Sequence, residues 1–263
     1  MTVAQQVIEA GLRLIAADVT DGTTGNVSAR DGDDFIITPT SMDYRMLVPA
    51  DLVRVNFESG EFVGRWQPSS EWRLHAEVYR ARPDVGAVIH HHATWCTAVA
   101  VAGRAIPVLV DEAADIGPIP TARYAPPASA ELAEVVAGEI AAGRNAILMA
   151  NHGALAVGAS VIESLRRALA LERLAKIFIA AEMLGGARGL DDKAVTESRQ
   201  FFARYRLHHD QFPSPTYAVP ARVSLHDLMA YSFRAGMTFM SLLQAIVLRR
   251  PSRQSAAHWL SAP

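Results

Sequence analysis

The stretch RPDVGAVIHHHATWCTAVA, residues 82–100, contains three consecutive histidines. A strand rich in β-branched residues is expected over Ala87–His90, and a helix should follow the histidines. Because successive side chains on a strand point to opposite faces, His90 and His92 should share one face while His91 points to the other. Two imidazoles at this spacing can bind one metal ion, and the competing interpretation is that all three rings are packing residues.

A fourth histidine, His152, follows the apolar strand expected at Asn145–Ala150. The ends of strands often carry the residues of a site, and Gly153 allows the backbone to turn sharply there. Three histidines with one open coordination position suit a divalent cation that must also bind a substrate. Imidazole ligands fit zinc, and they also accept manganese, cobalt or iron.

Glu71 lies at the start of a predicted helix, directly after Ser69 and Ser70. One interpretation is structural: Ser70 caps the helix, and Glu71 meets the positive end of the helix dipole. The other is chemical: Glu71 is a carboxylate beside the metal that ligates it or exchanges a proton with the substrate. The spacing of these residues alone slightly favours the structural interpretation.

Two loops are rich in small and hydroxyl-bearing residues, GTTGNVS at 22–28 and TPTS at 38–41. Their free amides and hydroxyls could wrap an oxyanion, although each loop taken alone is typical of a turn. Neither loop has a Walker or dinucleotide-binding pattern.

Helices and strands alternate along the chain without the regular repeat of a Rossmann sheet. The pattern predicts an α/β fold in which a mixed, mainly antiparallel sheet lies between helical layers. Helices are expected at 3–17, 69–80, 94–101, 129–142, 162–184 and 191–207, and strands at 26–29, 35–38, 52–56, 87–90, 107–110, 145–150 and 154–157.

The character of the chain changes towards the C-terminus. A charged helix is followed by a linker, Phe212-Pro-Ser-Pro, and then by one or two amphipathic helices over residues 224–249. We therefore expect a main domain over residues 1–210 and a helical C-terminal extension over residues 211–263 that covers a neighbour or a subunit interface.

Composition narrows the class of protein. The 263 residues carry a formal net charge of −2, and 50% of them are hydrophobic. This length allows one sizeable domain, and near-neutral charge gives no reason to expect nucleic acid or a membrane surface as partner. A single cysteine, Cys96, excludes an internal disulfide, which fits a reducing compartment. With no signal-peptide pattern and no apolar run of about 20 residues, we expect a cytoplasmic protein.

Five segments in one order change the interpretation of the separate motifs: GTTGNVS, ITPTS, PSSEWRLH, RPDVGAVIHHHATWCTAVA and ANHGALAVG. Together they resemble the class II aldolase and adducin family, over roughly residues 5–185 of the chain. The resemblance implies a three-layer α/β/α fold for the catalytic domain, a homotetramer with sites at subunit boundaries, and a zinc ion. It also implies a lyase that cleaves a ketose 1-phosphate to dihydroxyacetone phosphate and an aldehyde by way of a metal-stabilised enediolate.

Matching the motifs position by position assigns roles to residues of this chain. The resemblance gives the metal to His90, His92 and His152, and it gives Glu71 both metal ligation and acid–base catalysis. It places the phosphate of the substrate among residues of the two loops and the helix start: Asn26, Thr40, Ser41, Ser69 and Ser70.

Two positions differ from, or only loosely match, the best-known aldolase type of the family. Where that type has a tyrosine proton donor from the neighbouring subunit, this chain has Asp111 or Glu112. A carboxylate could relay a proton there only if its pKa were raised. Further on, Phe202 and Tyr205 match an aromatic pair that closes the aldehyde pocket, although their helical spacing also fits packing. We therefore expect Asp111 and Tyr205 to act on the aldehyde side.

Three other functions stay open. The absent tyrosine favours a decarboxylase of the same family, acting on a 3-oxo acid phosphate or an aromatic carboxylate. An epimerase is disfavoured by Glu71, because the related epimerases usually carry aspartate there. A non-catalytic adducin-like module is disfavoured because such modules lose the histidine ligands.

Overall fold

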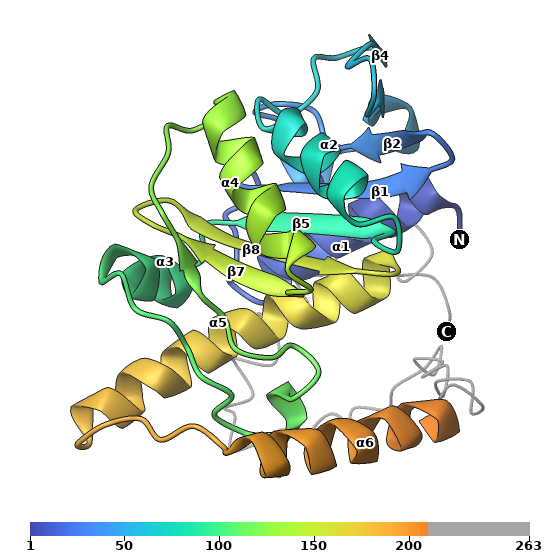
Figure 1. The fold of residues 1–263 in the computed structure, drawn as a ribbon. Coiled ribbons are helices and arrows are strands. Elements are labelled where there is room, and N and C mark those ends of the chain that lie inside the picture. The colour runs from blue at the N-terminus through green and yellow to red at the C-terminus, as the bar shows by residue number, and fades with distance from the viewer. Residues whose placement is uncertain (210–263) are drawn as a thin grey trace, which may run out of the picture. The chain divides into compact units, whose positions relative to one another are not determined.

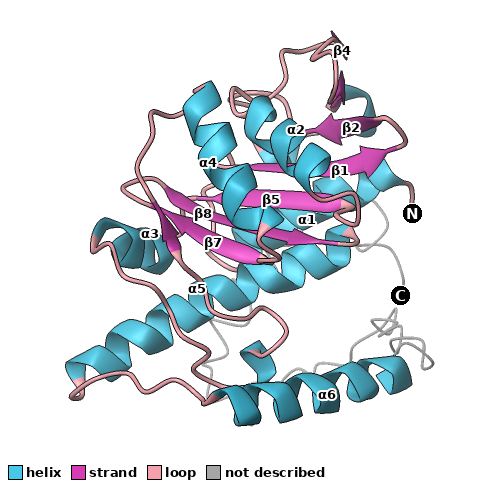
Figure 2. Ribbon diagram, viewed as in Figure 1, coloured by secondary structure: helices cyan, strands magenta, loops and turns pink. Residues whose placement is uncertain are grey.

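The computed structural model describes residues 1–209, and residues Met1–Arg206 form one compact unit. Its centre is a sheet of eight strands in the order β4-β3-β2-β1-β5-β8-β7-β6 (Figure 2). All neighbouring strands pair antiparallel except β6 and β7, which are parallel. The strands are β1 Asn26–Asp31, β2 Asp34–Ile37, β3 Val53–Asn56, β4 Phe62–Val63, β5 Ala87–His91, β6 Thr121–Ala122, β7 Ala146–Met149 and β8 Gly153–Gly158.

Helices cover both faces of this sheet, so the predicted three-layer α/β/α architecture is confirmed (Figure 1). One face packs against α2 (Trp72–Ala81) and α4 (Ala130–Ala141). The other packs against α1 (Val3–Ala16), α3 (Thr94–Val101) and α5 (Val161–Met183).

Because side chains alternate along a strand, each central strand contributes to the hydrophobic core on both faces of the sheet. On β5, Val88 is buried in the cluster that includes α2 and α4, whereas the next residue, Ile89, is buried in the cluster that includes α1 and α5. All five residues of β5 and all six of β8 are buried, as expected for central strands covered on both faces. The histidines at the end of β5 therefore start from a rigid part of the molecule.

Several helices begin where a hydroxyl side chain can accept a hydrogen bond from the first turn. The Ser129 hydroxyl accepts from the backbone N–H of Leu132 at the start of α4, and the Ser160 hydroxyl accepts from that of Glu163 at the start of α5. The last described helix, α6, spans Asp192–His209, close to the predicted one. The helices expected over residues 224–249 lie outside the described residues, so the proposed domain boundary stays a prediction.

The predicted strand at residues 107–110 is wrong. Only a single bridge, Ile106 to Ile119, forms there, and the chain continues into a 3₁₀ turn at Asp111–Ala113. Pro107 lacks the N–H that a ladder requires, which explains why pairing stops after Ile106. Two short strands, β4 and β6, were not predicted, because two residues carry no recognisable alternation. Further 3₁₀ turns lie at Tyr44–Met46 and Pro49–Asp51. Among residues 1–209, no helix has the length and apolarity that crossing a bilayer requires.

Candidate metal centre

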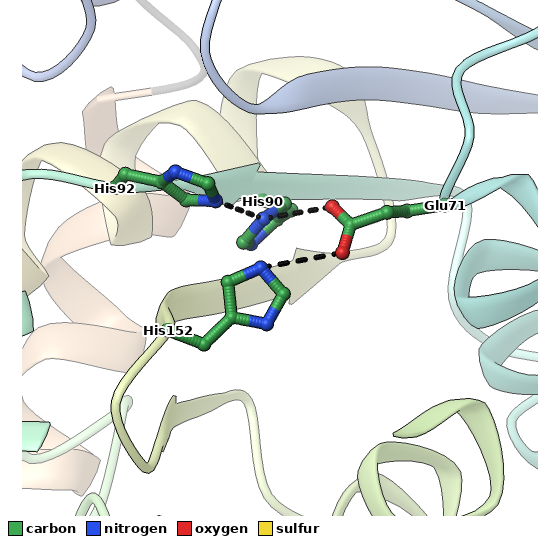
Figure 3. A group of neighbouring side chains, drawn as sticks. All are labelled: Glu71, His90, His92 and His152. Atoms are coloured by element: carbon green, nitrogen blue, oxygen red, sulfur yellow. Dashed lines mark hydrogen bonds and ion pairs between the residues drawn. The ribbon is translucent and has the colours of Figure 1, made fainter. Parts of the chain in front are cut away.

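The end of β5 places two histidines on one side and one on the other, as the alternation predicted. His90 pairs in register with Asn26 of β1, and its ring points towards Glu71 and His152 (Figure 3). His91 is fully buried, and its Nδ1 accepts a hydrogen bond from the backbone N–H of Ala93 at 3.3 Å. His91 is thus outside the cluster that the other rings form.

His92 is held between β5 and the start of α3. The carboxylate of Glu172, on α5, accepts hydrogen bonds from the free N–H groups of Trp95 at 3.0 Å and Cys96 at 2.9 Å. No side chain from α3 itself caps this helix, so Glu172 supplies the cap from a distant part of the chain. This contact fixes the helix that begins two residues after His92.

His152 lies in the turn between β7 and β8, directly before Gly153. A Cβ on Gly153 would lie 2.5 Å from the carbonyl oxygen of His91, which is closer than real Cβ contacts, so a glycine is needed here. Asn151 adopts a left-handed conformation with a φ of 55° to complete the turn. As a result the ring centroid of His152 lies 5.0 Å from those of both His90 and His92.

Glu71 occupies the N-cap position of α2, but its side chain makes no capping hydrogen bond. Its Oε2 lies 2.9 Å from Nε2 of His90, and its Oε1 lies 3.3 Å from Nε2 of His152 (Figure 3). Burial alone would raise the pKa of Glu71, but the His90 and His152 rings outweigh this effect and hold that pKa well below its usual range. No side chain of the described residues caps this helix, and Glu71 is buried, so the structural interpretation with a capping Ser70 is wrong.

The chemistry of the four side chains fits a cation. Their ligand atoms all lie within 4.8 Å of one another. Nδ1 of His90 donates to the carbonyl of Ala154 at 2.9 Å, which leaves the Nε2 lone pair facing the cluster. That Nε2 lies 2.8 Å from Nε2 of His92, a separation at which two lone pairs need a proton or a cation between them. Burial, and next the neighbouring rings of His90 and His152, lower the pKa of His92 to about 4, so its ring is neutral near pH 7.

An orphaned carboxylate oxygen supports the same conclusion. Oε1 of Glu71 is buried and has no hydrogen-bond partner among the described residues, despite its proximity to His152. Buried polar atoms without partners are uncommon in folded proteins. Neutral imidazoles and an ionised carboxylate are ligands that divalent metals of the first transition row accept.

A cleft of about 250 Å³ opens beside these ligands. Its shape depends on Gly25, where a Cβ would lie 2.4 Å from the carbonyl oxygen of His90. Asp21 folds the adjoining loop by accepting hydrogen bonds from the backbone N–H groups of Thr23 and Thr24, and these bonds, opposed by slight burial, lower its pKa to about 2. The cleft is lined by Thr23, Thr24, Gly25, Asn26, Pro39, Thr40, Ser41, Ser69, Ser70, Glu71, His92, Pro127 and His152.

All five residues expected at the phosphate thus line one cleft together with Glu71, His92 and His152. Asp111 does not line it: its side chain is exposed on the 3₁₀ turn and accepts a hydrogen bond from the backbone N–H of Glu112 at 2.8 Å. Glu112 forms an ion pair with Arg173 at 2.6 Å. Tyr205 has a side chain outside the described part of the chain. The roles expected for Asp111 and Tyr205 stay predictions.

One residue of this region, His75, has no role assigned from the sequence. Its Nε2 forms a short hydrogen bond with Oδ1 of Asn26. His75 follows Glu71 by four residues, which places both side chains on the same side of a helix. That spacing is the signal that could have identified it.

Comparisons with known proteins agree with this site. The chain matches the family model for the Class II Aldolase and Adducin N-terminal domain over residues 5–179. It is 37% identical over 211 residues to L-fuculose phosphate aldolase from Escherichia coli (strain K12), across 79% of this chain and 97% of that protein. It is 34% identical over 212 residues to the 5-methylthioribulose-1-phosphate/5-deoxyribulose-1-phosphate aldolase of Rhodospirillum rubrum, across 79% of this chain and 94% of that protein.

A solved structure of L-fuculose 1-phosphate aldolase has the same fold. The TM-score is 0.73 at 32% identity, and the match covers 76% of this chain and 96% of that one. The family match, the names of the relatives and the cluster of ligands all agree with a metal-dependent aldolase. The chain therefore belongs to the class II aldolase and adducin family, as a metal-dependent lyase of the aldolase type.

Proposed function

We propose that this protein cleaves a ketose 1-phosphate by a retro-aldol reaction that yields dihydroxyacetone phosphate and an aldehyde. The observation that carries the proposal is the convergence of three imidazoles and one carboxylate at the wall of a cleft whose other residues offer hydroxyls and amides. The relatives are aldolases for L-fuculose phosphate and for 5-methylthioribulose and 5-deoxyribulose 1-phosphates, which supports a substrate of this class.

His90, His92 and His152 hold the metal in this proposal, and Glu71 completes the set when no substrate is bound. Zinc suits three imidazole ligands with an open position, and manganese, cobalt or iron could take the same place. When bound, such a cation would polarise the substrate carbonyl and stabilise the negative charge left by cleavage.

The phosphate binds to neutral donors. Asn26, Thr40, Ser41, Ser69 and Ser70 line the cleft, and among residues 1–209 no lysine or arginine lines it. A compact ring of amides and hydroxyls can bind an oxyanion without a cationic side chain. Ser41, with a φ of 54°, lies at a turn in the second loop, where its conformation helps to curve the backbone around the cleft.

Glu71 moves a proton at the dihydroxyacetone phosphate end. Its carboxylate lines the cleft, where it can pass a proton to the carbon from which the aldehyde leaves. Asp111 and Tyr205 act at the aldehyde end, from the neighbouring subunit of a homotetramer with its sites at subunit boundaries.

The proposal also covers the organisation of the chain. Residues 1–210 form the catalytic domain, and residues 211–263 form the helical extension. The protein acts in the cytoplasm, on a phosphorylated sugar.

The test is a panel of aldehydes, each offered with dihydroxyacetone phosphate, with and without a chelator. Condensation should occur with at least one short aldehyde, stop with chelator and return when metal is restored. His92→Ala should lack activity under all these conditions. A turnover that chelator leaves unchanged would exclude the proposed chemistry.

A decarboxylase of the same family remains the second candidate, because Asp111 stands where the aldolase type has its tyrosine. Both reactions leave negative charge beside a carbonyl, so the same ligands could serve either one. Measuring carbon dioxide release from 3-oxo acid phosphates beside aldehyde release from ketose phosphates distinguishes them. Carbon dioxide without aldehyde would replace the proposal by this alternative.

A further inference from the structure

Five buried polar side chains form a continuous line that ends at Glu71. Tyr79, Ser28, His75 and Asn26 are at most 3% exposed, and Glu71 is 7% exposed. The Tyr79 hydroxyl lies 2.7 Å from Oγ of Ser28, which lies 2.6 Å from Nδ1 of His75. Nε2 of His75 contacts Oδ1 of Asn26, and Nδ2 of Asn26 lies 3.3 Å from Oε2 of Glu71. Only Glu71 and Asn26 of these line the cleft.

The Glu71 end of this line fixes the direction of every hydrogen bond in it. The ionised Oε2 of Glu71 can only accept, so Asn26 faces it with Nδ2 and turns Oδ1 to Nε2 of His75. Ser28 then donates to Nδ1 of His75, and His75 must carry its proton on Nε2. That proton is donated to Oδ1 of Asn26, which leaves the N–H₂ of Asn26 facing the carboxylate of Glu71.

The reverse arrangement is unfavourable at both ends. With its proton on Nδ1, His75 would present a lone pair to Asn26, whose amide would have to turn over. The amide oxygen would then face the ionised Oε2 of Glu71, where two acceptors repel each other. At the other end, the Ser28 and Tyr79 hydroxyls would be left with one buried proton that has no acceptor within this line, which costs free energy.

We propose that His75 is a positioning residue: through Asn26 it fixes the Glu71 carboxylate, with Oε2 bound by an amide and Oε1 turned towards His152. The inference deepens the proposed function and rests on the role given there to Glu71. The line of hydrogen bonds orients groups and passes no proton, because the Asn26 amide interrupts it. Burial, and next the nearby ring of His90, lower the pKa of His75 to about 3, so its ring stays neutral.

The tautomer of His75 can be measured without any activity. Nitrogen NMR of protein labelled with ¹⁵N-histidine, after metal removal, distinguishes a protonated from an unprotonated ring nitrogen, and the spectrum of His75→Gln identifies the signal. We expect Nε2 protonated and Nδ1 unprotonated. Tyr79→Phe should preserve this tautomer, because Ser28 can still donate, whereas Ser28→Ala should produce a mixture. A wild-type ring protonated on Nδ1, or on both nitrogens, would overturn the inference.

Two substitutions of similar size test the consequence for turnover. The amide nitrogen of Gln can replace Nε2 of His75 and donate to Asn26, whereas the shorter Asn side chain reaches only the position of Nδ1. His75→Asn should lower kcat by about 10- to 100-fold, because the buried Oδ1 of Asn26 would lose its donor, and His75→Gln should restore most of it. Metal content should stay at the wild-type value in both variants.

The outcomes separate this inference from the proposed function. Equal loss of kcat in the Gln and Asn variants at full metal content, or loss of folded protein alone, would show that His75 only packs. If the wild-type protein cleaves no ketose phosphate, the proposed function fails, while the NMR measurement still decides the hydrogen-bond direction. If the wild type is active and both His75 variants keep full kcat, the inference alone fails.

Discussion

Adding one methyl group at Gly153 should damage the metal centre without replacing a ligand. The new Cβ would lie 2.5 Å from the carbonyl oxygen of His91 and 2.9 Å from Cδ2 of His92, whereas ordinary contact begins near 3.4 Å. The imidazole can rotate, but the carbonyl belongs to β5, so β5 and β8 would have to separate by about 0.9 Å, the difference between 3.4 and 2.5 Å.

Overpacking of this kind in a buried sheet costs about 1–3 kcal/mol, and the upper end applies because backbone must move. The same substitution at Gly138, exposed on α4, meets nothing within 4 Å. Gly138→Ala should therefore raise the free energy of unfolding by about 0.5–1 kcal/mol, the usual gain of alanine over glycine inside a helix. The two variants form a matched pair.

The assay is urea denaturation of both variants and the wild type in chelator, followed by metal titration of the native proteins. Gly153→Ala should also bind metal about 10- to 100-fold more weakly, the range found when residues that support metal ligands are changed. If Gly153→Ala matched the wild type in stability and metal affinity, close packing of β8 on β5 could not be what positions His152.

Three further predictions concern other parts of the site. Glu71→Gln should keep its metal on the three histidines but lower kcat by about 10²–10⁴-fold, because the proton carrier is lost; steady-state kinetics beside metal analysis checks this, and unchanged kcat would contradict it. Glu172→Ala removes the cap of α3 behind His92, so it should lower the free energy of unfolding in urea by about 1 kcal/mol and weaken metal binding. The control Glu134→Ala, at an exposed position on α4, should change neither quantity. For metal-free protein, the free energy of unfolding should fall as the pH is lowered below about 6.5. Histidine in the unfolded chain binds a proton near that pH, whereas folded His75 does not, because burial chiefly lowers its pKa to about 3. Replacing His75 with Gln should reduce that pH slope by up to about 1.4 kcal/mol per pH unit in urea titrations, and an unchanged slope would show that folded His75 titrates normally.

The sequence predicted the geometry correctly where the alternation of side chains along one strand determines it. The alternation of β5 predicted that His90 and His92 lie apart from His91, and the structure has this arrangement. His152 is different, because its approach to His90 depends on β8 pairing with β5 over more than sixty intervening residues. No local spacing encodes that pairing, so only the order of the five segments could suggest it.

Glu71 and His75 show where sequence reasoning falls short. A Ser-Ser-Glu segment at a helix start satisfies both the capping and the metal interpretation, and only the tertiary position of α2 beside β5 chooses between them. A lone histidine on a helix forms no motif, so the sequence assigns no role to His75. Its contact with Asn26 joins β1 to α2, and neither element alone predicts it.

The most direct test of the account is the metal content of purified protein, measured beside that of His92→Ala. One divalent cation per chain should be present in the wild type after dialysis, and the variant should retain far less while remaining folded. A folded wild-type protein that binds no stoichiometric cation, or a His92→Ala protein that binds as much as the wild type, would contradict the assignment of these three rings.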